Sequence, residues 1–119
     1  VASAHGPLRV KLDAIELVPA QYKVFANSTA APYPSDPVLM RDLLAEQLAR
    51  PVRFVEQVRA MKEYGAATFL EVGPGHVLTR LVEQIARDSP DWVNVDAIAI
   101  DSSSGKKPGL EDLATALAD

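Results

Sequence analysis

Apolar residues recur along this chain at two different spacings. Four stretches repeat them every three or four residues, as one face of an α-helix does: residues 37–48, 52–61, 77–85 and 110–117. Three shorter stretches are apolar runs or alternate with polar residues, as β-strands do: residues 22–26, 67–72 and 93–100. The predicted order is strand, helix, helix, strand, helix, strand, helix. Such alternation predicts an α/β fold with a layered parallel sheet.

Prolines and glycines predict where these elements begin and end. Asp36 followed by Pro37 is a helix start, because aspartate can accept from free N–H groups and proline suits the first turn. Pro51 is expected to end this helix, and Gly65 to cap the next one. In the first 21 residues the apolar positions suit either a strand or a short helix, and an early helix is expected to be broken by the pair at 6–7, glycine and proline.

The run from 67 to 72 is nearly all apolar, which suits a parallel sheet covered on both faces. On that interpretation Leu70→Ala should cost about 2–5 kcal/mol of stability. Gly73-Pro74-Gly75 is expected to turn the chain after this strand. Residues 101–109 are a polar, linker-like loop that leads to the last predicted helix.

Composition narrows the class of protein. Hydrophobic residues make up 48% of the 119, enough for a packed core, and the formal net charge is −4, which argues against nucleic acid as a partner. The chain has no cysteine, which excludes disulfides, thiolate catalysis and cysteine-bound metals. No apolar run approaches the roughly 20 residues that span a bilayer. These features predict a cytoplasmic protein without a membrane partner.

Few residues could carry chemistry on their own account. His5 and His76 are the two histidines; they stand far apart and no carboxylate cluster accompanies them, so we expect no metal site. The turn at 73–76 could bind an anion at a helix start or be only a tight turn, with His76 at the surface. Glu71 could be a general base or a capping group. The arginine pair at 50 and 53 could clamp a carboxylate or be exposed helix-end charges.

Three stretches together resemble one family. They are "VFANSTAAPY" at 24–33, "QLARPVRF" at 47–54 and "FLEVGPGHVLT" at 69–79. They resemble, in order and spacing, the "V..N.TA.PY", "QL..PVRF" and "F.EVGPG.VLT" elements of the malonyl-CoA:acyl-carrier-protein acyltransferases, including acyltransferase domains of type I synthases. The resemblance covers residues 12–88 well and continues more loosely through the predicted strand at 93–100 to the last predicted helix. The tail looks most like synthases of the polyunsaturated-fatty-acid or enediyne type.

The resemblance implies a fold and a reaction. Residues 1–119 would be a C-terminal portion of an acyltransferase domain, with a partial parallel three-layer sheet from its α/β-hydrolase-like large subdomain. The family moves a malonyl group from coenzyme A, through a serine ester, to the phosphopantetheine of an acyl carrier protein, with no bound cofactor. The serine segment is not in these residues. The chain alone is therefore expected to be inactive, with the carrier protein and the N-terminal part of the same domain as partners.

The resemblance also implies two site residues. "AHGPL" at 4–8 resembles the family's "AFHSPL", which makes His5 the general base, although Ala4 replaces the aromatic residue and the stretch to Asn27 is several residues short. The backbone carbonyl of Gln47 would orient the imidazole. The residues alone leave two alternatives open: a noncatalytic α/β interaction module, and an anion-binding module that uses the Gly-Pro-Gly turn.

Overall fold

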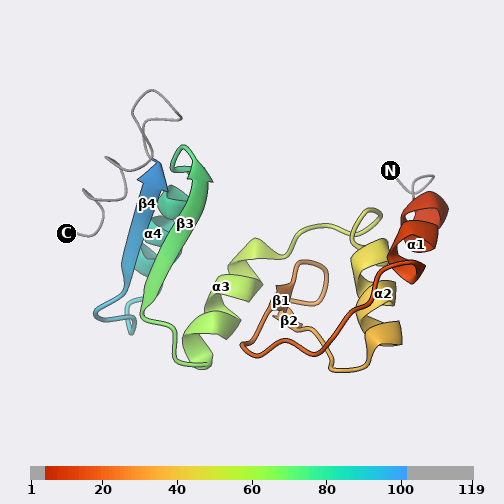
Figure 1. Cartoon of the computed structure of the whole chain (residues 1–119). Coiled ribbons are helices and arrows are strands. Elements are labelled where there is room, and N and C mark those ends of the chain that lie inside the picture. Colours follow the sequence, from red (N-terminus) through yellow and green to blue (C-terminus); the bar gives the residue numbers. More distant parts are fainter. Residues whose placement is uncertain (1–4, 102–119) are drawn as a thin grey trace. The chain divides into compact units, whose positions relative to one another are not determined.

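The computed structural model describes residues 5–101, with side chains from Gly6 onward. The predicted loop after Asp101 and the predicted last helix lie outside these residues. The chain divides into two compact units, residues 1–61 and 62–119. The elements are α1 (His5–Asp13), β1 (Phe25–Ala26), β2 (Ala31–Pro32), α2 (Pro37–Glu46), α3 (Phe54–Glu63), β3 (Thr68–Pro74), α4 (Val77–Arg87) and β4 (Asp96–Asp101) (Figure 1).

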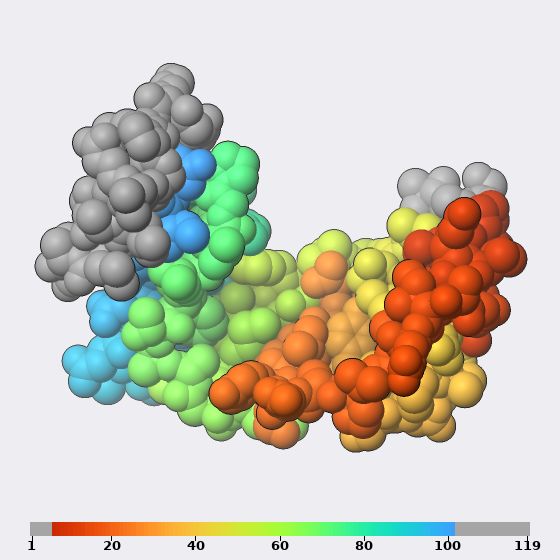
Figure 2. All heavy atoms as spheres, viewed as in Figure 1, coloured from red at the N-terminus to blue at the C-terminus, as the bar shows by residue number. Residues whose placement is uncertain are grey.

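In the first unit, α1 and α2 lie side by side and antiparallel (Figure 1). The expectation that the glycine and proline at 6–7 break an early helix was wrong, because α1 begins at His5 and includes both. Proline is tolerated there, since a first-turn N–H has no partner within its helix. The space-filling view shows the red atoms of α1 directly against the yellow atoms of α2 (Figure 2).

The predicted start of α2 is confirmed. Asp36 is its N-cap, an oxygen of the Asp36 side chain accepts from the Val38 N–H at 2.8 Å, and Pro37 begins the helix. Met40 and Ala45 are buried against the rest of the unit. The helix ends at residue 46, before the predicted stop at proline 51.

The predicted strand at 22–26 does not join a parallel sheet. Only Phe25 and Ala26 are strand residues, and they pair antiparallel with Ala31 and Pro32 in a hairpin. The turn chemistry of residues 27–30 folds the chain back on itself, which allows antiparallel pairing; parallel pairing would require a long crossover. With β2 as a fourth, unpredicted strand, the described strands therefore form two separate two-stranded sheets rather than one.

The second unit holds the parallel sheet. β3 and β4 pair in parallel and α4 connects them, as the α/β prediction required. Val82 and Ile85 of α4 are buried. β3 continues through Pro74, so the turn comes at Gly75, whose φ of +81° favours glycine, and not at 73–75 as predicted.

The prediction that β3 is covered on both faces was also wrong. Its residues alternate between exposed and half-buried, and Leu70 is 55% exposed and Val72 77% exposed. α4 covers the face of residues 69 and 71, because the Glu71 carboxylate bonds to the start of that helix. In the described part of the chain, no element covers the opposite face.

Candidate functional site

The two predicted catalytic residues lie at the ends of packed helices in the first unit. His5 is the first residue of α1, described by its backbone, and Gln47 is the C-cap of α2. The Gln47 N–H donates to the Leu43 carbonyl at 3.2 Å. Among the described groups, no N–H is bonded to the Gln47 carbonyl. That oxygen is thus an open acceptor at the negative end of a helix dipole.

An arginine of α2 fixes the opposite end of α1. Arg41 donates through Nε to the Leu12 carbonyl at 3.1 Å and through Nη2 to the Ile15 carbonyl at 2.7 Å. The last carbonyls of a helix have no partner within it, so a cation there satisfies them and complements the dipole. Arg41 therefore holds the C-terminal end of α1 beside the first half of α2.

A second arginine sets the same register from the other helix. Arg9 of α1 pairs with Asp42 of α2 and, at 2.9 Å, with Asp13 of its own helix. Hydrogen bonds to Asp42 and then to Asp13 raise the pKa of Arg9. These contacts and those of Arg41 make the α1–α2 pair a defined antiparallel arrangement.

Asn27 ties two of the three family-like stretches together. Its carbonyl accepts from the Arg53 N–H at 2.9 Å, and its side-chain oxygen accepts from Gln57 Nε2 at 2.7 Å. Gln57 is only 5% exposed. Sequence reasoning assigned Asn27 only a turn, although a signal existed: Gln57 stands beside Val58 on the apolar face of α3, and a buried amide needs a partner.

Glu71 is a capping group, the second of its two predicted roles. Its Oε1 accepts from the Thr79 N–H at 2.9 Å and the Thr79 hydroxyl at 2.8 Å, and Oε2 accepts from the Leu78 N–H at 3.2 Å. Burial alone would raise the pKa of Glu71, but the Thr79 and Leu78 hydrogen bonds and the nearby His76 together lower it. A general base with these donors already bound is poorly placed to accept a proton.

The same contacts argue against an anion site at residues 73–76. The Leu78 and Thr79 N–H groups that would hold an external anion already bind the carboxylate of Glu71. His76 is the N-cap of α4; it is half-buried rather than fully at the surface, and its Nδ1 has no hydrogen-bond partner in the described structure. The tight-turn interpretation fits this segment.

The predicted arginine clamp does not form a convergent pair. Arg53 Nε lies 3.7 Å from an oxygen of Glu56, and both side chains are about half exposed, at 50% and 53%. Arg50 is exposed after α2. Both arginines fit the alternative of exposed helix-end charges.

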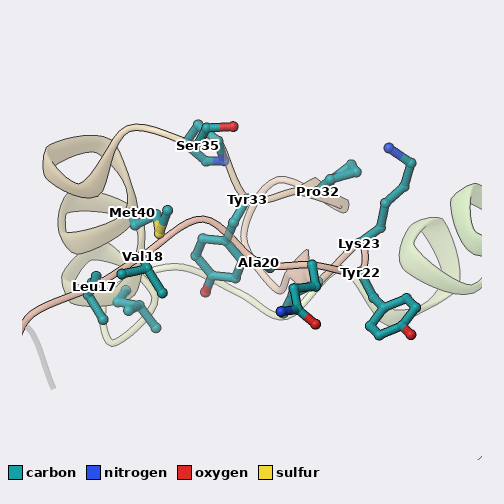
Figure 3. A pocket seen from close by; sticks show the side chains of 13 residues that line it. Leu17, Val18, Ala20, Tyr22, Lys23, Pro32, Tyr33, Ser35 and Met40 are labelled. Atoms are coloured by element: carbon teal, nitrogen blue, oxygen red, sulfur yellow. The ribbon is translucent and has the colours of Figure 1, made fainter.

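A surface pocket of about 400 Å³ lies elsewhere in the first unit. The ring of Tyr33 lies in it, with Val18 and Met40 nearby (Figure 3). Burial raises the pKa of the Tyr33 hydroxyl. Gln47 is not among the described residues that line the pocket. Among residues 5–101, no group of His, Asp and Glu side chains is arranged to hold a metal ion.

Several known proteins are similar to this chain in sequence. The chain is 36% identical over 92 residues to a polyunsaturated fatty acid synthase protein of Thraustochytrium, covering 77% of the chain and 3% of that protein. It is 36% identical over 80 residues to the malonyl CoA-acyl carrier protein transacylase of Bacillus subtilis, covering 67% of the chain and 25% of that protein. No family model matches the chain.

Solved structures agree. An acyl carrier protein S-malonyltransferase from Vibrio cholerae matches with a TM-score of 0.72 and 32% identity over 87% of the chain and 32% of its own. The chain is a relative of the malonyl-CoA–acyl carrier protein transacylases. A type II polyketide malonyl-transacylase, solved in complex with its acyl carrier protein, matches with a TM-score of 0.74 and 30% identity over 96% of the chain and 34% of its own.

The transacylase resemblance inferred from the three stretches is therefore confirmed, and so is the α/β fold. The chain spans about a third or less of the length of these relatives. No helix of the described residues is long and apolar enough to cross a membrane.

Proposed function

We propose that this chain supplies the general base of a transacylase that moves a malonyl group from coenzyme A to an acyl carrier protein. The observation that carries the proposal is the antiparallel α1–α2 pair in a chain related to malonyl transacylases. A histidine begins one helix and an open carbonyl ends the other. The remaining catalytic groups belong to a part of the domain outside these 119 residues, in an α/β-hydrolase-like core.

The helix register supports the pairing of His5 with Gln47. Arg9 and Asp42 face each other across the two helices. From Arg9, four residues back along α1 reach His5, about 6 Å along the axis; from Asp42, five residues onward reach Gln47, about 7.5 Å. Because the helices run in opposite directions, both steps lead to the same end of the pair (Figure 1).

In the proposed reaction, His5 Nε2 takes the proton of a serine hydroxyl from the other part of the domain. The serine oxygen attacks the malonyl thioester carbon, the carbon–sulfur bond breaks, and coenzyme A leaves as a thiol with that proton. The phosphopantetheine thiol of the carrier protein then gives its proton to His5 and attacks the serine ester. The serine oxygen leaves and takes the proton back, so no proton or electron is left over.

The Gln47 carbonyl has two effects in this scheme. By accepting from Nδ1–H it leaves Nε2 unprotonated and aimed at the serine, the role that a carboxylate plays in other triads. The C-terminal end of a helix also favours the imidazolium that forms during each proton transfer. We further propose that the domain works in the cytoplasm within a multienzyme synthase, with the acyl carrier protein as its partner.

The test supplies the missing part. The chain is joined to a serine-bearing N-terminal segment of a transacylase, and malonyl transfer to a carrier protein is measured. We expect transfer that falls at least 100-fold in His5→Ala, since a general base contributes roughly 10²–10⁴-fold. His76→Ala, which changes the other histidine, should retain activity. A joined protein that folds but never transfers malonyl would favour the noncatalytic interaction module; equal loss in both variants would reject His5 as the base.

A further inference from the structure

The residue four positions after Gln47 explains why the Gln47 carbonyl has no α-helical donor. In a continuing α-helix it would accept from the N–H of residue 51. That residue is Pro51, which has no N–H. The neighbouring carbonyl of Glu46 is bonded instead by the Ala49 N–H at 3.0 Å, which closes a tighter turn beneath it. Proline therefore removes the α-helical donor of the Gln47 oxygen, and among the described groups no other N–H takes its place.

Pro51 also disfavours an extension of α2 beyond its C-cap. A proline disfavours the helical region for the residue before it, so Arg50 cannot readily continue α2. Two residues after Pro51, the Arg53 N–H is held by the Asn27 carbonyl at 2.9 Å. The connection from α2 to α3 is thus anchored at both ends, and the axial approach to the Gln47 oxygen is not closed by another helical turn.

We propose that Pro51 is a positioning residue, which keeps the Gln47 carbonyl free to accept from the catalytic histidine. This inference rests on the proposed function, because it explains why the carbonyl that would accept from the histidine has no helical donor. A carbonyl oxygen can accept two hydrogen bonds, but a helical bond would take the axial direction, and the added turn would cover the helix end. Restoring an N–H at position 51 should therefore weaken the histidine contact without changing either partner.

The histidine tautomer reports the contact directly. An imidazole that donates Nδ1–H to a carbonyl carries its neutral proton on Nδ1, whereas an unpartnered one prefers Nε2. The chain has only two histidines, so long-range ¹H–¹⁵N spectra above the imidazole pKa should show two rings. His76→Gln assigns them, and His76 serves as an internal reference in the second unit.

The decisive variant is Pro51→Ala, with Pro90→Ala as matched control. Pro90 lies two residues after the C-cap of α4 in the second unit, so the control makes the same chemical change after another helix. In the wild type and the control we expect His5 mainly as the Nδ1–H form. In Pro51→Ala that form should become the minority, and the His76 signals should not move.

Each outcome decides something. If His5 in the wild type shows no preference for Nδ1–H, the pairing with Gln47 fails, and with it the proposed base. If the wild type shows the preference and Pro51→Ala keeps it, only the role of Pro51 is overturned. Should Pro51→Ala fail to fold, Pro51→Gly is the deciding variant. Glycine restores the N–H but disfavours helix by about 1 kcal/mol, so we expect a smaller loss of the Nδ1–H form of His5. An unchanged ratio of the two tautomers would reject the proposal.

Discussion

The carboxylate of Glu71 should stabilise the second unit by capping α4. Replacing Glu71 with alanine removes the acceptor for two backbone N–H groups and one hydroxyl, at 2.8–3.2 Å. Loss of a helix cap costs about 0.5–2 kcal/mol. Loss of a negative charge at a helix start costs about 0.3–1 kcal/mol more. Because the side chain is partly exposed, solvent screening reduces the second contribution, and we expect a total of about 1–2 kcal/mol at pH 7.

The pH dependence provides the sharper result. The hydrogen bonds make the pKa of Glu71 lower in the folded than in the unfolded state. The stabilisation by the charge is therefore fully present above the unfolded-state pKa of about 4.3, and it is lost as pH falls through the lower folded-state value. Glu71→Gln cannot ionise, so the difference in free energy of unfolding between it and the wild type should shrink below about pH 4.

The assay is urea unfolding followed by tryptophan fluorescence between pH 3 and pH 7. Trp92 is the single tryptophan and lies in the second unit, so its signal reports the unit that contains Glu71. Glu83→Gln is the matched control, because Glu83 is an exposed residue of α4. The capping argument is refuted if Glu71→Ala and Glu83→Gln lose the same stability at pH 7, or if the wild type and Glu71→Gln differ equally at pH 3 and pH 7.

Three further substitutions test the fold, each by its free energy of unfolding in urea. Asp36→Ala should cost about 1 kcal/mol, since its side chain caps α2 at Val38; no loss would show that the cap does not contribute. Gly6→Ala should raise the free energy of unfolding by at most about 1 kcal/mol, because nothing lies within 4 Å of the added carbon and alanine favours helix. A lower free energy of unfolding would contradict an exposed first turn of α1. Leu70→Ala should cost only about 1 kcal/mol, because Leu70 is 55% exposed. Ile85→Ala should cost about 2–5 kcal/mol, because Ile85 is only 6% exposed. Equal costs would mean that the face of the sheet that carries Leu70 is covered.

Local chemistry predicted those elements whose causes are local. Asp36 and Pro37 start α2 because the acceptor and the fixed φ act within one turn of the helix. The apolar stripes of α3 and α4 follow from apolar residues that recur every three or four positions in the sequence. The relation to the transacylases also followed from the sequence, because three short stretches in a set order are specific even where each one alone is not.

What the sequence alone could not determine depends on residues far apart along the chain. The pairing of β1 with β2, the exposed face at Leu70 and the bond between Asn27 and Arg53 are decided by where the chain returns in space, and spacing does not encode that. The site shows both contributions. The sequence alone shows that residue 51 is a proline without an N–H for the Gln47 carbonyl, whereas the antiparallel packing of α1 on α2 depends on contacts between residues far apart along the chain.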